Sequence, residues 1–361
     1  MRTARKRDKR RKVLAARRRL IDRQQTVEGR YVPIAVPHGA VRVAAPRHFN
    51  VMDRFWRRKL TAFLDRIRNV TIGQSREAFI DFSDTERLGP GGTLLFLAEI
   101  DRIKRARRGE RLLSCNFPRN RIVEQVLQQV GILDILGRKA RLVESRFGET
   151  VRHWRFATGN SVEGEKVEPF VGPLDGRLAA SLTDGLYVGL TEAMTNCSQH
   201  AYEEHRQDGI ETTPDLRRWW MFSQEKDGLL SVAFCDLGMG IPRSLDVSRQ
   251  WDKSVVASIL SRLNFTSRTE ANLIRAAMEL RKTRTQLSHR GKGLPQILDV
   301  VREAASGFLQ IHSNRGMFHY NAASDKEILE DFPQSIRGTL ILWELPLPKR
   351  SQLALPFGEP Q

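Results

Sequence analysis

The chain has 361 residues, of which 40% are hydrophobic and 28% charged, and its formal net charge is +18. This length suffices for two domains with cores of their own, and no apolar run approaches the roughly 20 residues that a membrane-spanning helix needs. The N-terminus lacks the apolar segment of a secretory signal, and three widely spaced cysteines match neither a disulfide framework nor a zinc site. The composition therefore predicts a soluble cytoplasmic protein with no membrane partner.

The positive charge is concentrated at the N-terminus. Residues 1–23 hold twelve Lys and Arg against Asp8 and Asp22, a net charge of +10, which leaves +8 for the remainder. We assign 1–30 to a basic arm with two alternatives. Either residues 2–23 form a helix that binds the phosphate backbone of a nucleic acid, or the arm is a disordered, solvating tail.

Strands and helices alternate in the first half of the chain. Apolar residues recur at helical spacing over 53–70, and the following segments are typical of strand, helix, strand and helix in turn. These segments are "EAFIDFS" at 77–83, "GGTLLFLAEIDRIKRA" at 91–106, "RLLSCNF" at 111–117 and "RNRIVEQVLQQVGILDIL" at 119–136. The alternation predicts a small α/β layer domain at 50–145.

This stretch resembles a STAS domain, the fold of anti-sigma-factor antagonists. "IDFSDTERLGPGGTLLFLAEI" has the strand, turn and helix of that family, and "NFPRNRIVEQVLQQVGILDIL" resembles its final strand, turn and helix. The sequence departs from the family at the turn, where Gly89, Pro90 and Gly91 replace the Asp and the phosphorylatable Ser. The resemblance thus implies a docking surface without a phosphorylation switch, for which Thr93 is a poor substitute. The alternative is a generic α/β scaffold.

A second pattern begins after a Gly- and Pro-rich connection at 146–176, which contains one strand-like run, "RHWRFA". We expect a long helix at 177–205, a hairpin that turns at Asp227-Gly228, and a charged segment at 243–290 that includes a helix, "NLIRAAMELRKTRTQ". Further on we expect the helix "GLPQILDVVREAA", the hairpin "GFLQIHSNRGMFHY" and the strand "GTLILWELPL". Residues 348–361 are expected to form a loose tail.

Three polar residues recur every four positions on the long helix. Glu192, Asn196 and His200 share one face, and the opposite face carries the leucines 178, 182, 186 and 190. An Asn oxygen suits Mg²⁺, which takes few protein ligands, and a Glu one turn earlier can serve as a base. An amphipathic helix without such a role shows the same pattern, so the spacing alone does not decide.

Three glycine-containing turns follow. In "FCDLGMGIP" an apolar strand delivers Asp236, a carboxylate that can accept a hydrogen bond from an exocyclic amine, and Gly238 and Gly240 permit a tight turn. In "SHRGKGLPQI" the segment Gly291-Lys292-Gly293 offers backbone N–H groups and a charge at a helix N-terminus, where phosphate binds favourably. In "RGTLILWEL" Thr339 opens a strand with a hydroxyl group.

Taken in order, these four motifs resemble the N, G1, G2 and G3 boxes of the GHKL ATPase superfamily, over about 180–347. The resemblance implies a Bergerat ATP-binding fold, an α/β two-layer sandwich at 177–347, which binds ATP and Mg²⁺. It implies that Glu192 is the general base, Asn196 the Mg²⁺ ligand and Asp236 the adenine reader. It places 243–290 as the ATP lid, and it gives nucleotide contacts to Gly238, Gly240, Thr339, His200, Gly291, Lys292 and Gly293.

Three functions are compatible with these motifs. The first is an ATP-dependent switch that controls a regulatory protein partner, with Ser/Thr kinase or slow ATPase activity, as in anti-sigma-factor systems. The second is a nucleic-acid-binding regulator that uses the basic arm with ATP as a conformational ligand. The third is an ATP-binding scaffold without chemistry. A sensor histidine kinase is disfavoured, because the nearest upstream histidine, His153, lies in a strand-like run.

Overall fold

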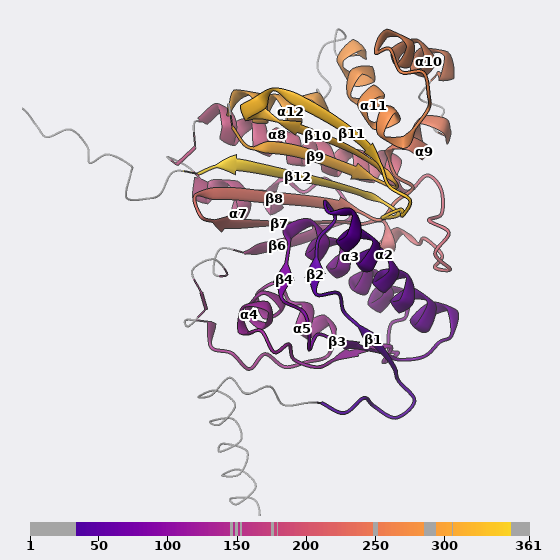
Figure 1. Ribbon diagram of the computed structural model, residues 1–361, viewed down its shortest axis with the longest axis vertical. Coiled ribbons are helices and arrows are strands. Elements are labelled where there is room, and N and C mark those ends of the chain that lie inside the picture. Colours follow the sequence, from indigo (N-terminus) through magenta and orange to yellow (C-terminus); the bar gives the residue numbers. More distant parts are fainter. Residues whose placement is uncertain are drawn as a thin grey trace, which may run out of the picture.

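The protein is a mixed α/β structure built on one seven-stranded sheet (Figure 1). The computed structural model describes residues 34–144, 147–148, 151, 154–174, 177–178, 180–247, 252–284, 294–304 and 306–347. The predicted basic arm at 1–30 and the tail at 348–361 lie outside this range, as does His153. None of the described helices has the length and apolar content of a membrane span.

The first half of the described chain is a small layer of parallel strands and helices. Strands β1, β3 and β5 pair in that order, and the short strands β2 and β4 pair beside them. The elements are β1 (Val41–Ala44), β2 (His48–Phe49), α2 (Arg54–Arg68), β3 (Ala78–Asp81), β4 (Arg87–Leu88), α3 (Pro90–Ala106), β5 (Leu113–Cys115), α4 (Arg121–Gln129) and α5 (Ile132–Ile135).

The strands and helices expected between 77 and 136 are confirmed, with one difference. The last helix is divided into α4 and α5 at Gly131, whose φ of 76° is left-handed and interrupts the helix. Two of these helices have side-chain caps that fix where they begin. Asp53 accepts a hydrogen bond from the Trp56 N–H at the start of α2, and Asn120 caps α4 in the same way.

The second half carries the large sheet, with strand order β11-β10-β9-β12-β8-β7-β6. Its elements are β6 (Arg155–Gly159), α7 (Glu168–Val171), α8 (Ala180–Asn196), β7 (Trp219–Lys226), β8 (Leu229–Asp236), α9 (Ile241–Val247), α10 (Lys253–Arg262), α11 (Glu270–Arg284), α12 (Leu294–Glu303), β9 (Phe308–Ser313), β10 (Gly316–Asn321), β11 (Lys326–Asp331) and β12 (Thr339–Pro346). Both expected hairpins are present, and Asp227 and Gly228 each have the positive φ of a two-residue hairpin turn.

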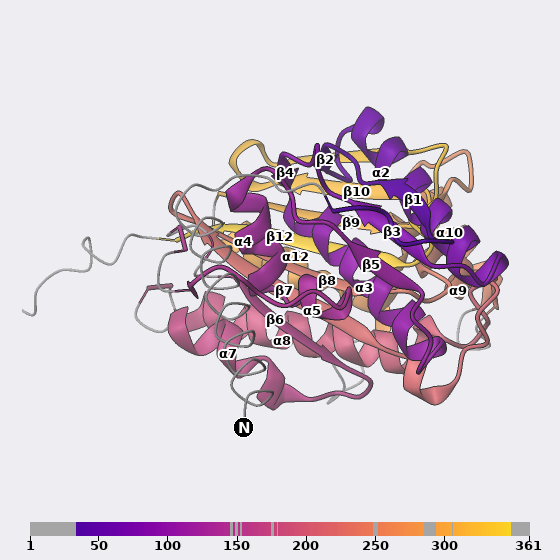
Figure 2. The ribbon, with the colours of Figure 1, turned by 90° about the horizontal axis from the view of Figure 1, so that it is seen from below.

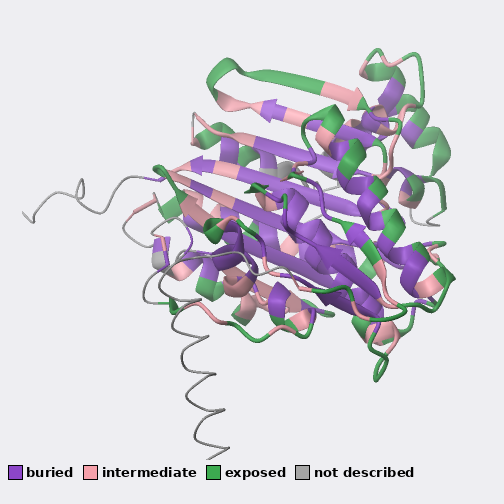
Figure 3. Cartoon of the chain, turned by 60° about the horizontal axis from the view of Figure 1, so that its bottom comes forward, coloured by how far each residue is buried: buried purple, intermediate pink, exposed green. Residues whose placement is uncertain are grey.

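The long helix expected at 177–205 is shorter in the structure. The α-helix ends at Asn196, and one π-helical turn, η5 (Cys197–Ala201), follows it. Strand β11 and the helices α9 and α10 were not expected from the sequence. The outer strand β11 is mostly exposed and green in Figure 3, and its charged residues hide the apolar alternation of a strand.

Both faces of the large sheet are covered, one by α8 and α12 and the other by helix α3 of the N-terminal half (Figures 1 and 2). On β7, Trp219 and Met221 pack into one core with α8, α11 and α12, and Trp220 and Phe222 pack into a second core with the N-terminal layer. Strands buried on both faces are apolar almost continuously, as β7 and β8 are. The two halves of the chain therefore share a hydrophobic core.

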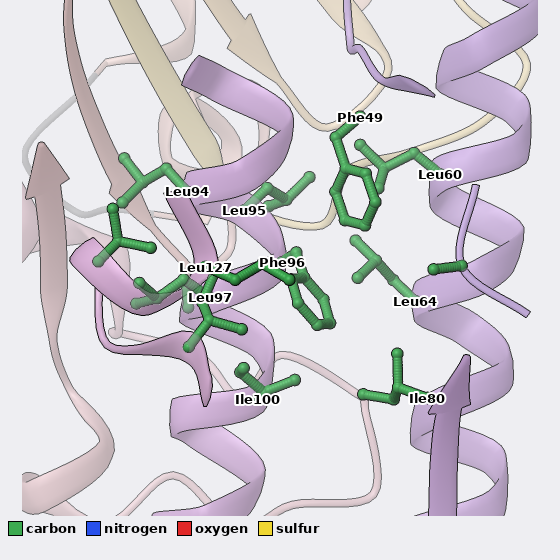
Figure 4. Packing of buried hydrophobic residues seen from close by; sticks show 14 of the residues in the cluster. Phe49, Leu60, Leu64, Ile80, Leu94, Leu95, Phe96, Leu97, Ile100 and Leu127 are labelled. Atoms are coloured by element: carbon green, nitrogen blue, oxygen red, sulfur yellow. The ribbon is translucent and has the colours of Figure 1, made fainter. Parts of the chain in front are cut away.

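Helix α3 is the element that joins the two halves. Every residue from Gly91 to Ile103 is buried, because one side of α3 meets the sheet and the other meets α2. Figure 4 shows Phe96 pointing towards Phe49 and Leu64, and the rings of Phe96 and Phe49 lie 5.4 Å apart. On the sheet side, the Trp220 indole N–H donates to the Asp101 carboxylate over 2.9 Å.

Candidate functional site

A small cavity of about 60 Å³ lies where strand β8 ends and strand β12 begins, beside α9 and α11. It is lined by residues from three of the four motifs: Asn196, His200, Asp236, Gly240 and Thr339. These positions are up to 143 residues apart in the sequence, from 196 to 339. The fold thus brings the end of α8, the turn after β8 and the start of β12 to one point.

Asp236 is a buried carboxylate that lines this cavity, with 6% of its surface exposed. It lies opposite Thr339 in the antiparallel β8–β12 ladder, and the Thr339 side chain hydrogen-bonds to it. The Gly238 N–H donates to its Oδ1 over 2.9 Å. Burial raises the pKa of Asp236 to about 6, and these hydrogen bonds offset part of that effect.

The two glycines of the turn are required by close packing. A Cβ on Gly238 would overlap the Ala201 carbonyl group, which also accepts a hydrogen bond of 2.7 Å from the Met239 N–H. Gly240 has φ 82°, and a Cβ there would lie 2.5 Å from Nδ2 of Asn314. The turn after β8 is therefore pressed against the end of η5 on one side and the β9–β10 turn on the other.

The helical face with Glu192, Asn196 and His200 is only partly preserved. Asn196 is the last residue of α8, and the π-helical turn changes the spacing before His200, whose Nδ1 lies 3.2 Å from Glu203 Oε1. Asn196 and His200 line the cavity, and Glu192, half-buried one turn earlier, does not. Of the leucines on the opposite face, 186 and 190 are buried in the core as expected.

Two residues of the β9–β10 turn belong to the site, and the sequence motifs did not include them. Ser313 Oγ accepts from the Ile241 N–H over 2.8 Å and lies 3.2 Å from Thr339 Oγ1. Asn314, at φ 52°, donates from Nδ2 to the Met239 carbonyl over 2.8 Å. A Ser-Asn pair at a hairpin turn is common, so only the three-dimensional arrangement identifies these residues as part of the site.

The outer wall of the cavity comes from the segment that the sequence assigns to a lid. Ser244 and Leu245 of α9 and Ala277 of α11 line it. Helix α11, which confirms the helix expected in this segment, is attached to the sheet edge by polar contacts. The Ala271 N–H donates to Asp331 Oδ1 over 3.2 Å, and Arg275 Nε donates to Glu327 Oε2 over 2.7 Å.

The predicted phosphate-side residues Gly291, Lys292 and Gly293 lie outside the described residues, and α12 begins just after them, at Leu294. In the part of the chain that the structure describes, no three His, Cys, Asp or Glu side chains are grouped as metal ligands.

A larger cavity of about 660 Å³ lies between the N-terminal layer and strands β7, β8 and β12. Gly89, Pro90 and Gly91 line it together with Trp154 and Glu344, and burial raises the pKa of Glu344. Leu342, Trp343 and Glu344 of the last motif line it, but none of the residues with a predicted role at the nucleotide does. The smaller cavity is therefore the candidate site.

Comparison with protein-family models, with curated proteins and with solved structures gave no match to this chain.

Proposed function

We propose that the C-terminal half of the chain binds ATP with Mg²⁺ and serves as an ATP-dependent switch for a protein partner. The observation that carries this proposal is the convergence of Asn196, Asp236, Gly240 and Thr339 on one cavity. These are four of the residues to which the GHKL resemblance gives nucleotide contacts.

The hydrogen-bonding groups around Asp236 suit adenine. A carboxylate accepts hydrogen bonds only, so Asp236 matches the exocyclic amine of adenine and disfavours the keto oxygen that guanine carries in its place. The neighbouring Thr339 and Ser313 hydroxyls, 3.2 Å apart, offer both donors and acceptors to the rest of a base or to a bridging water. We therefore propose that Asp236 reads the base and that Thr339 supports it.

The size of the cavity constrains how a nucleotide enters. Its volume, about 60 Å³, is far below the roughly 300–1,000 Å³ of small-molecule pockets. The base fits only if α9 and α11 move outwards, since Leu245 and Ala277 form the outer wall. The surface ion pairs Arg268–Asp246 and Arg243–Glu204 add little to the attachment of this lid segment, because exposed pairs of this kind are weak. The buried apolar residues of α11 hold it in the core, and these contacts would have to shift when the lid moves. We propose that nucleotide binding shifts the lid and that this movement signals to the partner.

The reaction depends on Glu192. The two outcomes consistent with the GHKL resemblance are transfer of the γ-phosphate to a protein hydroxyl and slow hydrolysis, and a general base at Glu192 serves either. Glu192→Ala should lower turnover by about 10²–10⁴-fold and leave ATP affinity within a fewfold of the wild type. A wild-type protein that binds ATP without any turnover would favour the scaffold function.

We also propose that residues 50–145 form a STAS-like domain. Its helix α3 is buried against the chain's own sheet. We propose that the surface which STAS domains use for a separate partner is here engaged within the chain, consistent with a fusion of two modules that interact.

Isothermal titration calorimetry tests the nucleotide site. Wild-type protein in Mg²⁺ should bind ATP and should bind GTP much more weakly. Asp236→Asn should weaken ATP binding by about 1–3 kcal/mol, because a buried hydrogen bond to the base is lost or poorly paired. If the wild type and Asp236→Asn bound ATP with equal affinity, Asp236 would have no role in recognising the base.

A further inference from the structure

Arg57 of helix α2 is a fully buried guanidinium far from the nucleotide motifs in sequence, with 0% of its surface exposed. Its Nη2 donates to the Asn314 carbonyl over 2.9 Å, and its Nη1 lies 3.0 Å from His312 Nδ1. Its planar group also stacks over the Phe332 ring, with Cζ 4.1 Å from the ring centre. Arg57 thus connects the N-terminal layer to the β9–β10 turn.

The surroundings of Arg57 are unusual for a buried charge. The hydrogen-bond partners within the described chain are backbone carbonyls and the ring of His312, without a directly paired carboxylate. Burial and the Arg57 charge together lower the pKa of His312 well below its usual value, so that Nδ1 of a neutral ring can accept from Arg57. Burying a guanidinium in this way has a large desolvation free energy. An apolar side chain would pack α2 against the sheet without that penalty. The cost suggests a role beyond packing.

The residue that Arg57 holds, Asn314, lies beside the candidate site and contacts two segments that form it. The Asn314 carbonyl accepts from Arg57 and from the Ile336 N–H, and its own N–H donates to the Gly338 carbonyl over 3.0 Å. Its side chain donates to the Met239 carbonyl and accepts from the Gly338 N–H over 3.3 Å. Asn314 therefore ties the turn after β8 to the residue just before Thr339.

We propose that Arg57 is a positioning residue for the nucleotide pocket, acting through Asn314. By fixing the Asn314 backbone in its left-handed conformation, Arg57 sets the separation of the Gly240 turn and the start of β12, between which the base would lie. The N-terminal layer is in this way part of the nucleotide site, although no residue of that layer lines the cavity. This inference rests on the proposed function, and it also makes a claim about the protein without nucleotide.

Hydrogen exchange measures that claim directly. In nucleotide-free protein, Arg57→Met should speed exchange at the Ile241 and Gly338 amides at least tenfold more than at amides of the same protein in β7. Arg57→Lys keeps the charge and loses the planar fork, so it should have an intermediate effect. Asn314→Asp keeps the left-handed turn and loses the donor to Met239, so it should loosen segment 237–241 even if Arg57→Met fails to fold.

Arg141→Met is the matched control. Arg141 also belongs to the N-terminal layer, stacks over a Phe ring at 3.9 Å, and pairs through two hydrogen bonds with the buried Glu124. This variant should lower the melting temperature. It should change the exchange rates of the 241 and 338 amides by no more than those of amides elsewhere in the protein. The positioning role would be overturned if Arg57→Met and Arg141→Met changed the exchange rates of these two amides equally. It would also be overturned if Arg57→Met raised exchange rates by the same factor throughout the protein.

Calorimetry with Mg-ATP on the same variants completes the test. Arg57→Met should weaken ATP binding at least tenfold, and Arg141→Met should not weaken it. Unchanged ATP affinity in Arg57→Met would overturn the inference and leave the proposed function standing. Failure of the wild-type protein to bind ATP would overturn the proposed function, and selective exchange at 241 and 338 would still support Arg57 as the residue that holds this turn.

Discussion

Gly91 of helix α3 lies directly against Leu340 of strand β12: a Cβ atom on Gly91 would be 2.9 Å from Leu340 Cδ2. The same Cβ atom would lie 3.0 Å from Cδ1 of Leu342, which is also on β12. Gly91 is thus a point of close contact between the two halves of this chain. This contact, together with the shared core, suggests that the halves fold as one cooperative unit.

Gly91→Ala should destabilise the protein by about 1–3 kcal/mol, because added volume in a packed core forces neighbouring side chains to move. Ala favours a helix over Gly by about 1 kcal/mol at most, so overpacking should win. Urea unfolding, followed by tryptophan fluorescence, should show one transition in both proteins. Gly148→Ala is the control, since its nearest neighbours lie at 3.6 Å. Two separate transitions would contradict the shared core.

Thr93 should not be phosphorylated. Its side chain is fully buried in α3, and its Oγ1 finds no hydrogen-bond partner among the described residues. Mass spectrometry after incubation with Mg-ATP should find no phosphate at this position. Because an unpaired buried hydroxyl costs about 1–3 kcal/mol, Thr93→Val should leave the melting temperature unchanged or raise it. Stoichiometric phosphate on Thr93 would show that α3 leaves the sheet.

Most helices and strands of the described chain could be predicted from apolar periodicity, but β11, α9 and α10 and the mutual packing of the elements could not. The segment "TLLFLAEI" is apolar all round, which predicted a buried helix without showing which surface covers it. Of the residues for which the sequence predicted roles at a nucleotide, Asn196, His200, Asp236, Gly240 and Thr339 line one cavity, and Glu192 and Gly238 do not line it. Asn314 and Arg57 were missed because their roles depend on contacts between residues 257 positions apart.

Asp236 should lower the stability of the nucleotide-free protein near neutral pH. Its pKa is 3.8 when unfolded and about 6 when folded, so the folded state holds the proton more tightly between these values. The free energy of unfolding should fall by at most about 3 kcal/mol as pH rises from about 4 to about 6. Above that range, Asp236 should contribute no further change with pH.

Asp236→Asn removes that titration. At pH 7.5 the variant should melt at a higher temperature than the wild type, because it no longer buries an ionised carboxylate. It should nevertheless bind ATP more weakly, so the substitution affects stability and binding in opposite directions. Differential scanning calorimetry from pH 4 to pH 8 measures the first effect. A variant that melts lower than the wild type at pH 7.5 would show that the carboxylate stabilises the fold rather than serving a ligand.

The basic arm, residues 1–23, should bind nucleic acid through phosphate contacts with little sequence preference. With about six contacts, log K should fall against log salt with a slope near −5, since each contact contributes roughly −0.9. Deleting 1–23 should abolish this binding and leave ATP affinity unchanged. Fluorescence polarisation of both proteins at several salt concentrations measures it, and a flat salt response would indicate a solvating tail.

A crystal structure with Mg²⁺ and a non-hydrolysable ATP analogue tests the nucleotide site most directly. The adenine amine should lie about 3 Å from the Asp236 carboxylate, Mg²⁺ should contact the Asn196 oxygen, and α9 and α11 should stand further from the sheet than they do without ligand. An analogue bound in the larger cavity beside Trp154, or bound with Asp236 out of contact, would contradict the assignment.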